Sequence, residues 1–404
     1  MKKTHIGVLS EHFINWGGGI DFIRLILNSL TSIDRESKNE INIYVFIPKQ
    51  SYSKIKIKNK LKTVINTFTN KKHQLQKIIP KQSIVNSFIS INDSIKIIFY
   101  NNSEAGLVKL VQKHNIDFII PVFSPLSASF PIPWIGYIYD FQHKYYPEFF
   151  SEEEIKLRDS QFLVMLNKAN TIIVNAKSVK KDVNKFYGKT KSNKVVALPF
   201  CPVLNDDFFK TNTDIEKYNL PNKYFMVSNQ FWKHKDHKTA FRAFKLFLDN
   251  HQHNKDIALV CTGQTHDFRF PNYFEELKEL ISELELDKNI FILGYIPKID
   301  QLQILKKCIA VIQPTLFEGG PGGFSVFESV AYGIPSIVSD ISVNKEIEDE
   351  TVTFFKTGSA IHLSKTMLSV FQKEKYQYSI DELVIKNNKS LFEMGENILN
   401  ILNK

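Results

Sequence analysis

Residues 317–329 read FEGGPGGFSVFES, and this stretch is the most informative part of the chain. It follows an apolar run at residues 309–312 that predicts a buried strand, and its second half has apolar residues at helical spacing. Four glycines at a strand-to-helix junction let the backbone approach a ligand, and amides at a helix start bind anions. Glu318 and Glu328 flank the loop, and carboxylates suit neutral hydroxyls. The combination indicates a sugar-nucleotide site, and the alternative is a glycine turn between two solvated acids.

Short apolar runs alternate with helical patterns along the 404 residues, which is typical of doubly wound parallel sheets. A chain of this length exceeds what one hydrophobic core normally serves, so we expect two α/β domains. The polar stretch at residues 204–221 predicts the linker between them. The expected strands are residues 6–9, 41–47, 95–100, 118–122, 135–139 and 171–174 before the linker, and 224–227, 257–262, 290–293, 309–312, 336–339 and 352–355 after it.

Residues 317–329 closely resemble the donor-binding signature of retaining glycosyltransferases of family 4. In that signature a Glu precedes a glycine-rich helix start, a second Glu follows, and a small-residue helix then leads to Gly-x-Pro before a strand. Glu318 and Glu328 match the two acids, and residues 333–335 match the Gly-x-Pro. Nine residues separate the acids here, so the loop is two residues longer than the family pattern, within residues 319–323.

The resemblance implies the GT-B fold, in which two Rossmann-like domains face each other across a cleft and a C-terminal helix crosses back to the first domain. We expect the acceptor-side domain at residues 1–205, joined by the last helix at about residues 387–404. The nucleotide-sugar domain is expected at residues 206–386. The last apolar residues have the spacing of such a helix, and they are Leu391, Met394, Ile398 and Leu402.

The resemblance also assigns a diphosphate site. Residues 224–236 look like the family's first strand and loop of the second domain, where an Arg and a Lys bind the donor diphosphate. Lys235 matches the Lys, and a lysine suits this role because a diphosphate leaving group needs a compensating positive charge. The Arg position falls on Asn229 or Gln230. Neighbours that could supply the second charge are Lys233, His234 and His237.

Carboxylates and helix-start amides complete the donor site that the resemblance implies. Glu328 would bind the ribose hydroxyls, and Glu318 would bind hydroxyls of the transferred sugar. The strand-end loop that contains Ile296 resembles the loop that meets the nucleotide base. The amides expected to face the diphosphate belong to Gly322, Gly323, Phe324, Ser325 and Val326. The family is generally assigned a front-face displacement, in which a donor phosphate oxygen helps deprotonate the acceptor, so no side-chain nucleophile is expected.

The first half of the chain matches the family less specifically. Residues 16–22 follow the first strand and look like the family's first glycine loop. Gly18 and Gly19 would then face the donor phosphates and the acceptor. The alternative is a flexible glycine turn.

A second stretch of the first half, residues 137–150, resembles a segment in which many family members carry His-Asp and then a Pro-Glu-Phe-Phe turn. Asp140 takes the position of the Asp, and Tyr139 takes the position of the His. His143 lies three residues after Asp140 and is a candidate for the polar role toward the transferred sugar. The alternative for His143 is a structural histidine.

The charge distribution favours an anionic partner. The formal net charge is +10, and lysines are concentrated between residues 49 and 92, where no Asp or Glu occurs. We expect peripheral contact with an anionic membrane surface, the alternative being a solvated lysine face. Nucleic acid is not expected, because no recognised motif accompanies the lysines. Three widely spaced cysteines and no signal-peptide pattern favour a cytoplasmic location, peripheral on the inner face of the membrane.

These features predict a retaining, metal-independent glycosyltransferase. It would move a hexose, with mannose as one candidate, from a UDP- or GDP-sugar to a glycan or lipid-linked glycan such as a lipopolysaccharide, O-antigen or capsule precursor. No Asp-x-Asp motif is present to hold a divalent ion, and no cofactor is expected besides the donor substrate. The alternatives are a non-catalytic GT-B scaffold in a glycan-assembly complex, and a sugar-nucleotide epimerase or phosphorylase on the same fold.

Overall fold

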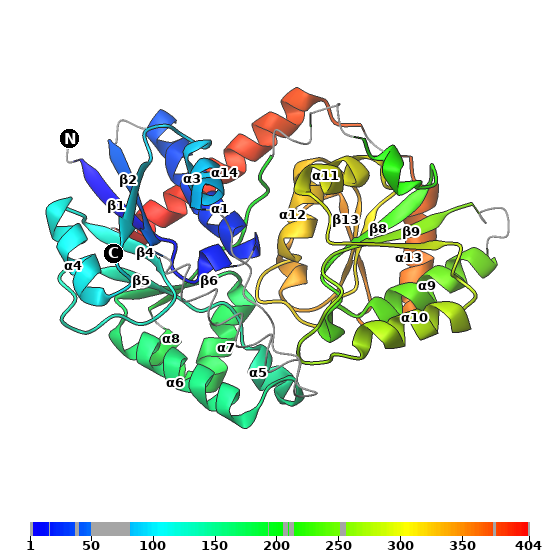
Figure 1. The fold of residues 1–404 in the computed structure, drawn as a ribbon, viewed down its shortest axis with the longest axis horizontal. Helices are drawn as coiled ribbons and strands as arrows, with labels where there is room; N and C mark the ends of the chain where they lie inside the picture. The colour runs from blue at the N-terminus through cyan, green and yellow to red at the C-terminus, as the bar shows by residue number, and fades with distance from the viewer. Residues whose placement is uncertain are drawn as a thin grey trace. The chain divides into compact units, whose positions relative to one another are not determined.

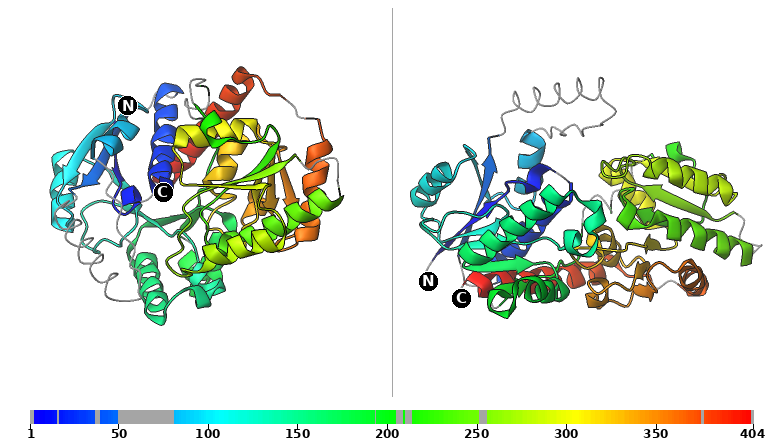
Figure 2. Two further views of the ribbon diagram at one scale, coloured as in Figure 1. Left: turned by 45° about the vertical axis from the view of Figure 1, so that its right-hand side comes forward. Right: turned by 90° about the horizontal axis from the view of Figure 1, so that it is seen from below.

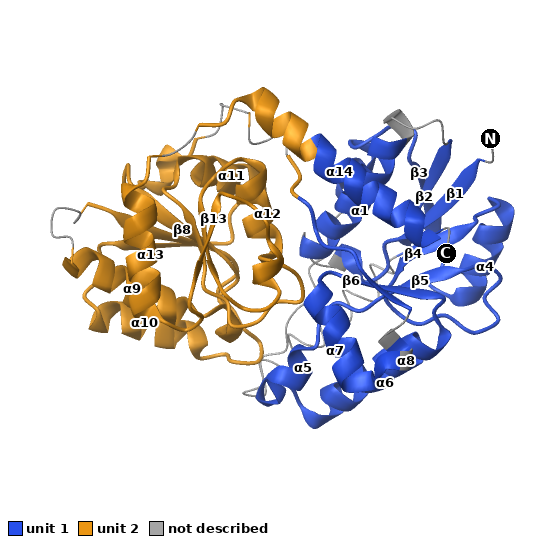
Figure 3. Cartoon of the chain, turned by 180° about the vertical axis from the view of Figure 1, so that it is seen from behind, with its two compact units in different colours: residues 1–201, 388–404 blue, residues 202–387 orange. Residues whose placement is uncertain are grey.

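The computed structural model describes residues 3–15, 17–36, 40–49, 81–192, 194–204, 209, 214–250, 256–374 and 377–402. The chain forms two compact units, residues 1–201 with 388–404 and residues 202–387, which Figure 3 colours blue and orange. Each unit contains one sheet whose described strands all pair in parallel, with helices on both of its faces (Figure 1).

The sheet of the first unit has seven strands in the order β3-β2-β1-β4-β5-β6-β7. They are β1 (Thr4–Leu9), β2 (Ile41–Pro48), β3 (Lys96–Tyr100), β4 (Phe118–Val122), β5 (Trp134–Tyr137), β6 (Thr171–Val174) and β7 (Val195–Ala197). The described helices are α1 (Gly17–Glu36), α3 (Lys81–Ile89), α4 (Glu104–Lys113), α5 (Gln142–Tyr145), α6 (Glu152–Lys168), α7 (Lys177–Tyr187), α8 (Lys189–Ser192) and most of α14 (Ile380–Leu402), with 3-10 turns η1 (Phe13–Asn15) and η2 (Pro147–Phe149). The central strands are nearly continuous apolar runs, as parallel strands covered on both faces require.

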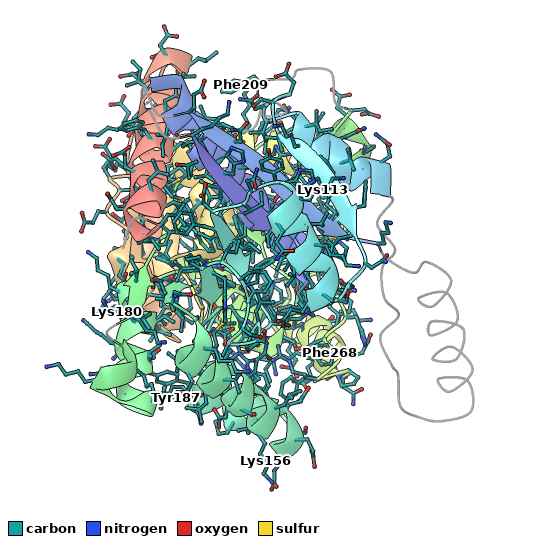
Figure 4. All side chains as sticks on the ribbon, turned by 90° about the vertical axis from the view of Figure 1, so that its left-hand side faces the viewer. Lys113, Lys156, Lys180, Tyr187, Phe209 and Phe268 are labelled. Atoms are coloured by element: carbon teal, nitrogen blue, oxygen red, sulfur yellow. The ribbon has the colours of Figure 1, made fainter. Side chains whose placement is uncertain are left out.

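Local sequence explains where the surface helices begin. Ser151 and Glu154 form a reciprocal cap at the start of α6, in which each side chain accepts a hydrogen bond from the other residue's backbone amide. Such a cap stabilises a helix start by about 1 kcal/mol. Lys156 of α6 and Lys180 of α7 extend outward into solvent (Figure 4).

Helix α14 completes the first unit, because its residues from Asn388 onward belong there. It lies beside α1 (Figures 1 and 2). Gly395 permits this close packing, since a Cβ at that position would collide with the carbonyl oxygen of Ser29 and with the side chain of Ile33. The residues whose spacing predicted this helix are all buried, namely Leu391, Met394, Ile398 and Leu402.

The sheet of the second unit has six strands in the order β10-β9-β8-β11-β12-β13. They are β8 (Tyr224–Ser228), β9 (Ala258–Thr262), β10 (Ile290–Gly294), β11 (Val311–Gln313), β12 (Ser336–Ser339) and β13 (Val352–Phe355). The described helices are α9 (His237–Asn250), α10 (Tyr273–Glu283), α11 (Lys298–Lys307), α12 (Gly323–Ala331) and α13 (Ala360–Gln372), with 3-10 turns η4 (Glu216–Tyr218), η5 (Lys233–Lys235) and η7 (Asn344–Glu346).

Alternating residues of β8 connect the two layers of the second unit's core. Phe225 and Val227 pack with apolar residues of α9, α10 and α13. Tyr224 and Met226 point the other way and pack with residues of α11. The sheet is therefore buried on both faces, which leaves its strand ends as the places where a ligand can approach.

Strand order fixes which loops meet in each unit. In the first unit the order reverses between β1 and β4, and in the second it reverses between β8 and β11. Ligands of open α/β sheets bind outside the carboxyl ends of the strands at such a switch point. The loops after β1 and β4, and those after β8 and β11, are therefore the ones to inspect for a site.

The prediction of an α/β chain is confirmed, and all twelve predicted strands are present with ends shifted by at most two residues. The three-residue strand β7 was not predicted, because Val195–Ala197 is too short to give a pattern. Part of the predicted linker belongs to the second unit and packs against its hydrophobic core. The residues that do so are Phe209, Ile215, Tyr218 and Leu220. Most of the lysine-rich stretch, residues 50–80, lies outside the described residues. Within the described residues no helix is long and apolar enough to cross a bilayer.

Candidate functional site

The switch point of the second unit carries an ion pair. Lys235 ends the turn η5 in the loop after β8, and Glu318 lies in the loop after β11. The Lys235 Nζ donates to Glu318 Oε1, and only 13% and 12% of the two side chains are exposed. The backbone holds the two loops together, because the Leu316 amide donates to the carbonyl oxygen of His234 at 2.8 Å. Two residues that are 83 positions apart thus form one polar centre.

Gln313 orients the Glu318 carboxylate through a hydrogen bond. Its side chain is 1% exposed at the end of β11. The Gln313 Nε2 donates to the carbonyl oxygen of Gly322 at 3.0 Å and to Glu318 Oε1 at 3.3 Å. Asn229 Nδ2 in turn donates to Gln313 Oε1. Asn229, one of the two residues at the family's Arg position, therefore has a positioning role and no ligand-facing charge.

The start of α12 is shaped by two glycines in the left-handed region. Gly322 has φ 61° and Gly323 has φ 64°. A Cβ on Gly323 would lie 3.7 Å from Gln313 Nε2 and 4.0 Å from Glu318 Oε2, so the helix start adjoins the polar centre. The first amides of an α-helix have no partner within the helix, which suits them to bind an anion.

The Gly322 amide does not fit the predicted phosphate role, because it donates to Asn344 Oδ1 at 2.7 Å. Asn344 is fully buried, and its Nδ2 donates to the carbonyl oxygen of Ser339 at 2.9 Å. This bond fixes the loop. Of the amides predicted to face a phosphate, only those from Gly323 onward are then left for that role. The Val326 side chain is buried with Val330 and Val338, so only its backbone can face a ligand.

Glu328 forms an ion pair on the same helix. Its Oε1 accepts from Nζ of Lys298, the first residue of α11. The carboxylate is 16% exposed and the lysine side chain 38% exposed. Sequence reasoning did not anticipate this partner. The pair places the Glu328 carboxylate beside the loop after β10.

In the loop after β10, Ile296 is buried whereas its neighbour Tyr295 is exposed. The Ile296 side chain is buried in the core with Leu302, so a base could meet only its backbone. Tyr295 is exposed, and Gly294 adopts φ 66° with open space where a Cβ would be. Gln230 is also exposed, and its carbonyl oxygen accepts from the Trp232 amide at 2.7 Å.

Two of the three neighbours proposed for the second positive charge are neutral. His237 is fully buried and stacks on Phe231 at 4.3 Å, and neither ring nitrogen has a hydrogen-bond partner among the described residues. Burial, reinforced by the charge of Lys235, lowers the pKa of His237 to about 3. Burial and the charges of Lys235 and Arg269 likewise hold the pKa of His234 well below its ordinary value. Neither histidine therefore supplies the second positive charge.

Arg269 is a cation that the sequence analysis missed. It lies in the loop after β9, and its charge acts on His234 together with that of Lys235. The guanidinium lies over the rings of Trp232 and Phe268, at 5.7 and 5.5 Å from their centroids. The buried Asp267 carboxylate accepts from the backbone amides of both Arg269 and Lys233. Only the fold brings this loop next to the loop after β8.

The predicted residues of the first unit lie in a separate polar network. Asp140 forms an ion pair with Arg158, whose guanidinium lies over Tyr139 at 4.8 Å from the ring centroid. The His143 side chain is fully buried, and its Nε2 lies 3.0 Å from Asp159 Oδ1. Burial lowers the pKa of His143, although the bond to Asp159 opposes that effect. A buried, bonded imidazole cannot reach a sugar, so the structure favours the structural role for His143.

Gly18 and Gly19 lie inside the first turn of α1, which begins at Gly17. The predicted glycine loop is therefore a helix start in the first unit. The other predicted site residues that belong to this unit are Asp140 and His143. Lys235, Glu318, Glu328 and the α12 glycines belong to the second unit. Within the described residues no group of His, Cys, Asp or Glu is arranged to hold a metal ion.

Residues 209–387 match the family model of glycosyl transferases group 1. This part of the chain is similar to the glycosyl transferases of group 1. It carries the ion pair, the glycine-rich helix start and Glu328. The predicted resemblance to glycosyltransferases is thereby confirmed. No curated protein matches the sequence.

Solved structures share the fold of the whole chain. HepE from Anabaena, in complex with UDP and glucose, is 13% identical with a TM-score of 0.58, and the match covers 99% of this chain and 97% of HepE. A glycosyltransferase from Rickettsia africae is 15% identical with a TM-score of 0.58, covering 100% and 96%. The lipopolysaccharide outer core galactosyltransferase WaaB in its apo form is 13% identical with a TM-score of 0.55, covering 98% and 99%. These matches confirm the GT-B fold class.

The buried His237 should make the stability of the protein depend on pH. Below about pH 6.5 the unfolded chain binds a proton at this ring, whereas the folded chain does so only near pH 3. The free energy of unfolding should therefore fall by about 1.4 kcal/mol per pH unit on this account as the pH drops from 6.5 towards 3. For His237→Phe, the free energy of unfolding measured by urea denaturation should fall by about 1.4 kcal/mol less per pH unit than it does for the wild type.

The matched control is His362→Gln, which changes an exposed histidine of the same unit. The change in pH slope that His237→Phe produces should exceed the change that His362→Gln produces. Equal slopes for His237→Phe and the wild type would show that His237 is protonated or solvated in the folded chain.

Proposed function

We propose that this chain is a retaining, metal-independent glycosyltransferase of family 4 that transfers a hexose from a UDP- or GDP-sugar to a growing glycan. The acceptor would be a glycan or lipid-linked glycan, such as a lipopolysaccharide, O-antigen or capsule precursor. The observation that carries the proposal is the Lys235–Glu318 pair beside the start of α12, at the switch point of the second unit. A cation, helix-start amides and a carboxylate together fit a diphosphate attached to a polyol.

Each group has a role in stabilising the departing nucleotide. Negative charge grows on the diphosphate as the glycosidic bond breaks, and fixed donors stabilise that charge without reorganising. Lys235 and the amides of Gly323 and Ser325 are such donors. Arg269 is proposed as a second cation, since it lies close enough to act on His234, the residue before Lys235. No divalent ion and no cofactor is needed in this scheme.

The carboxylates would bind the neutral parts of the donor. Glu328 is proposed to accept hydrogen bonds from the ribose, with Lys298 orienting its carboxylate. Glu318 is proposed to accept from hydroxyls of the hexose, while Gln313 fixes its orientation. A donor phosphate oxygen would take the proton of the acceptor hydroxyl, so the side chains position the reactants and none forms a bond to the sugar.

Similar proteins support the choice of substrates. The titles of the HepE structures include UDP, glucose and UDP-glucose, and WaaB is a galactosyltransferase of the lipopolysaccharide outer core. A surface glycan would be built at the inner face of the cytoplasmic membrane, where peripheral attachment through lysines is proposed.

The proposed activity should appear in a donor panel. UDP- and GDP-sugars are added to the protein in EDTA, and the melting temperature and slow donor hydrolysis are measured. At least one donor should raise the melting temperature, because a ligand that binds only the folded state stabilises it. The same donor should be hydrolysed in EDTA. Binding without hydrolysis would favour a scaffold, and hydrolysis that needs added magnesium or manganese would contradict metal independence.

Glu328→Ala should weaken binding of the free nucleoside diphosphate and of the donor alike, because both carry the ribose. A lost charged hydrogen bond costs roughly 1.5–3 kcal/mol, about ten- to a hundredfold in Kd. Calorimetry with UDP and GDP measures it. Lys298→Ala is the control, since it removes the ion-pair partner and leaves the carboxylate. If both variants keep the wild-type affinity, Glu328 only pairs with Lys298.

Lys235→Ala and Glu318→Ala should differ although the two residues form one ion pair. Lys235→Ala should lower kcat by about a hundredfold, because its charge acts on the transition state. Glu318→Ala should reduce transfer while leaving the nucleoside diphosphate affinity nearly unchanged. Single-turnover transfer and calorimetry separate the two effects. Full transfer by Glu318→Ala would mean that the longer loop has moved this acid out of the sugar site.

Arg269→Ala should weaken UDP binding about tenfold and uridine binding little, because the guanidinium is expected to contact only phosphate. Arg269→Lys should recover part of the loss. Phe268→Ala, a change in the exposed neighbouring side chain, serves as the control. Equal losses for UDP and uridine, accompanied by a lower melting temperature, would indicate that Arg269 only braces the loop with Asp267.

A further inference from the structure

We propose that the first unit carries a docking surface for an anionic lipid bilayer on its helices α6, α7 and α8. We call this surface the lysine face, and its exposed lysines are Lys168, Lys177, Lys180, Lys181, Lys185 and Lys189. The inference rests on the membrane location given in the proposed function, and it names the surface that would hold the protein there. The lysine face is separate from the donor site and from the lysines of residues 49–92.

The positive charge of the lysine face is almost unopposed in the sequence. Residues 160–205 contain eight lysines and a single acid, Asp182. The Asp182 carboxylate is half-buried and accepts a hydrogen bond from the Tyr145 hydroxyl. Burial lowers the pKa of Lys194, and the charge of Lys191 adds to this effect, so like charges lie close together here. The face therefore presents an excess of positive charge to its surroundings.

The spacing of the lysines on α7 argues against a face that is merely solvated. Lys177, Lys181 and Lys185 follow one another at intervals of four residues, so they lie on one side of the helix. Like charges at this spacing destabilise a helix, whereas acids between them would stabilise it. Helix α6 has the stabilising arrangement, because Lys156 pairs with Glu152 four residues before it. The lysine row of α7 thus lowers the stability of the helix, and an anionic surface bound to it would remove that repulsion.

An exposed leucine of α6 lies beside these lysines. Leu163 is 44% exposed. It lies one helical turn after Asp159, which accepts from the Tyr187 hydroxyl of α7 at 3.0 Å. It also lies one turn before Asn167, whose Oδ1 accepts from Lys191 Nζ of α8. Leu163 is therefore on the side of α6 that adjoins α7 and α8, as the arrangement of the three helices in Figure 1 shows.

An exposed tyrosine lies at the other side of α7. Tyr145 of α5 is 42% exposed, and Lys185 Nζ is 4.6 Å from the centroid of its ring. Tyrosine is enriched at membrane–water interfaces, because its ring is apolar and its hydroxyl is polar. The lysine face thus combines positive charge with one aliphatic and one aromatic side chain. This is the composition that binds the headgroup region of an anionic bilayer.

The same composition favours a bilayer over nucleic acid. Residues 160–205 contain no arginine, the side chain that binds phosphates and bases with two parallel hydrogen bonds. Lysines are point charges, which suit the diffuse negative potential above anionic lipids. An exposed leucine gains nothing against a phosphate backbone, whereas it is stabilised at the boundary between headgroups and acyl chains.

The division of charge between the units agrees with attachment through the first unit. The first unit has 31 lysines and arginines against 17 acids, and the second has 21 against 25. An anionic surface therefore attracts the first unit more strongly than the second. Each lysine close to such a surface strengthens binding roughly fivefold, so three lysines together give about a hundredfold. Salt screens this attraction.

The test is sedimentation of the full chain with two kinds of vesicle, at low and at high salt. One kind contains equal parts of phosphatidylcholine and phosphatidylglycerol, and the other contains phosphatidylcholine alone. One variant replaces three lysines of α7, as Lys177→Gln, Lys181→Gln and Lys185→Gln. The control removes the same charge from exposed lysines of the second unit, as Lys288→Gln, Lys307→Gln and Lys365→Gln. A further variant is Leu163→Ser, and the melting temperature and UDP and GDP affinities of every protein are measured.

The wild type should bind the phosphatidylglycerol vesicles at low salt, bind them less at high salt, and leave the phosphatidylcholine vesicles in solution. The α7 variant should bind about a hundredfold more weakly, and the control should lose clearly less than that. Leu163→Ser should weaken binding roughly tenfold, because the leucine no longer enters the bilayer. The melting temperature and the nucleotide affinities should stay at their wild-type values in all three variants.

Three results would overturn the lysine face as a membrane surface. They are no vesicle binding by the wild type, equal losses in the α7 variant and the control, and wild-type binding by Leu163→Ser. The last result, combined with binding of a DNA oligonucleotide that the α7 variant loses, would assign the face to nucleic acid instead. A protein that binds the vesicles but no nucleotide or donor would contradict the proposed function and still support the lysine face. Donor hydrolysis without vesicle binding would overturn the lysine face alone.

Discussion

Parallel pairing of the strands is the constraint on which the rest of this structure depends. Every strand of a parallel sheet has its carboxyl end at the same edge, so every loop that follows a strand lies there. Lys235 and Glu318 meet for this reason, although 83 positions separate them in sequence. His12 and Ser124 meet across 112 positions for the same reason. Residues with no sequence relation thus become neighbours through strand order alone.

Burial then decides which polar residues at that edge carry charge. Lys235 has a carboxylate partner, whereas His237, two residues on, lies between aromatic rings and stays neutral. His143 is neutral for the same reason, because the desolvation of its ring outweighs the bond to Asp159. Histidines next to a lysine in a loop are therefore poor evidence of positive charge until their burial is known.

The sequence was sufficient to predict the α/β architecture and the glycosyltransferase resemblance of residues 209–387, because long apolar runs and the glycine-rich segment are local signals. It could not give the partners of polar side chains. Nothing in the sequence around Asn229 indicates that it orients Gln313, and nothing links Glu328 to Lys298. Arg269 escaped notice because its loop follows a different strand from the one that carries Lys235. Gly322 was assigned correctly to a tight helix start, but its amide is used by Asn344.

Helix α14 has a consequence for how the protein is made. Its residues from Asn388 onward pack against α1, with Gly395 against the backbone of Ser29, and α1 begins at Gly17. On the ribosome, synthesis runs from the N-terminus at about 5–20 residues per second, and domains generally fold as they emerge. The first unit cannot bury this face of α1 until the whole second unit has been translated and released. The unit that is synthesised first is thus the last to be finished, and its exposed apolar face is the part of the nascent chain that a chaperone would have to protect.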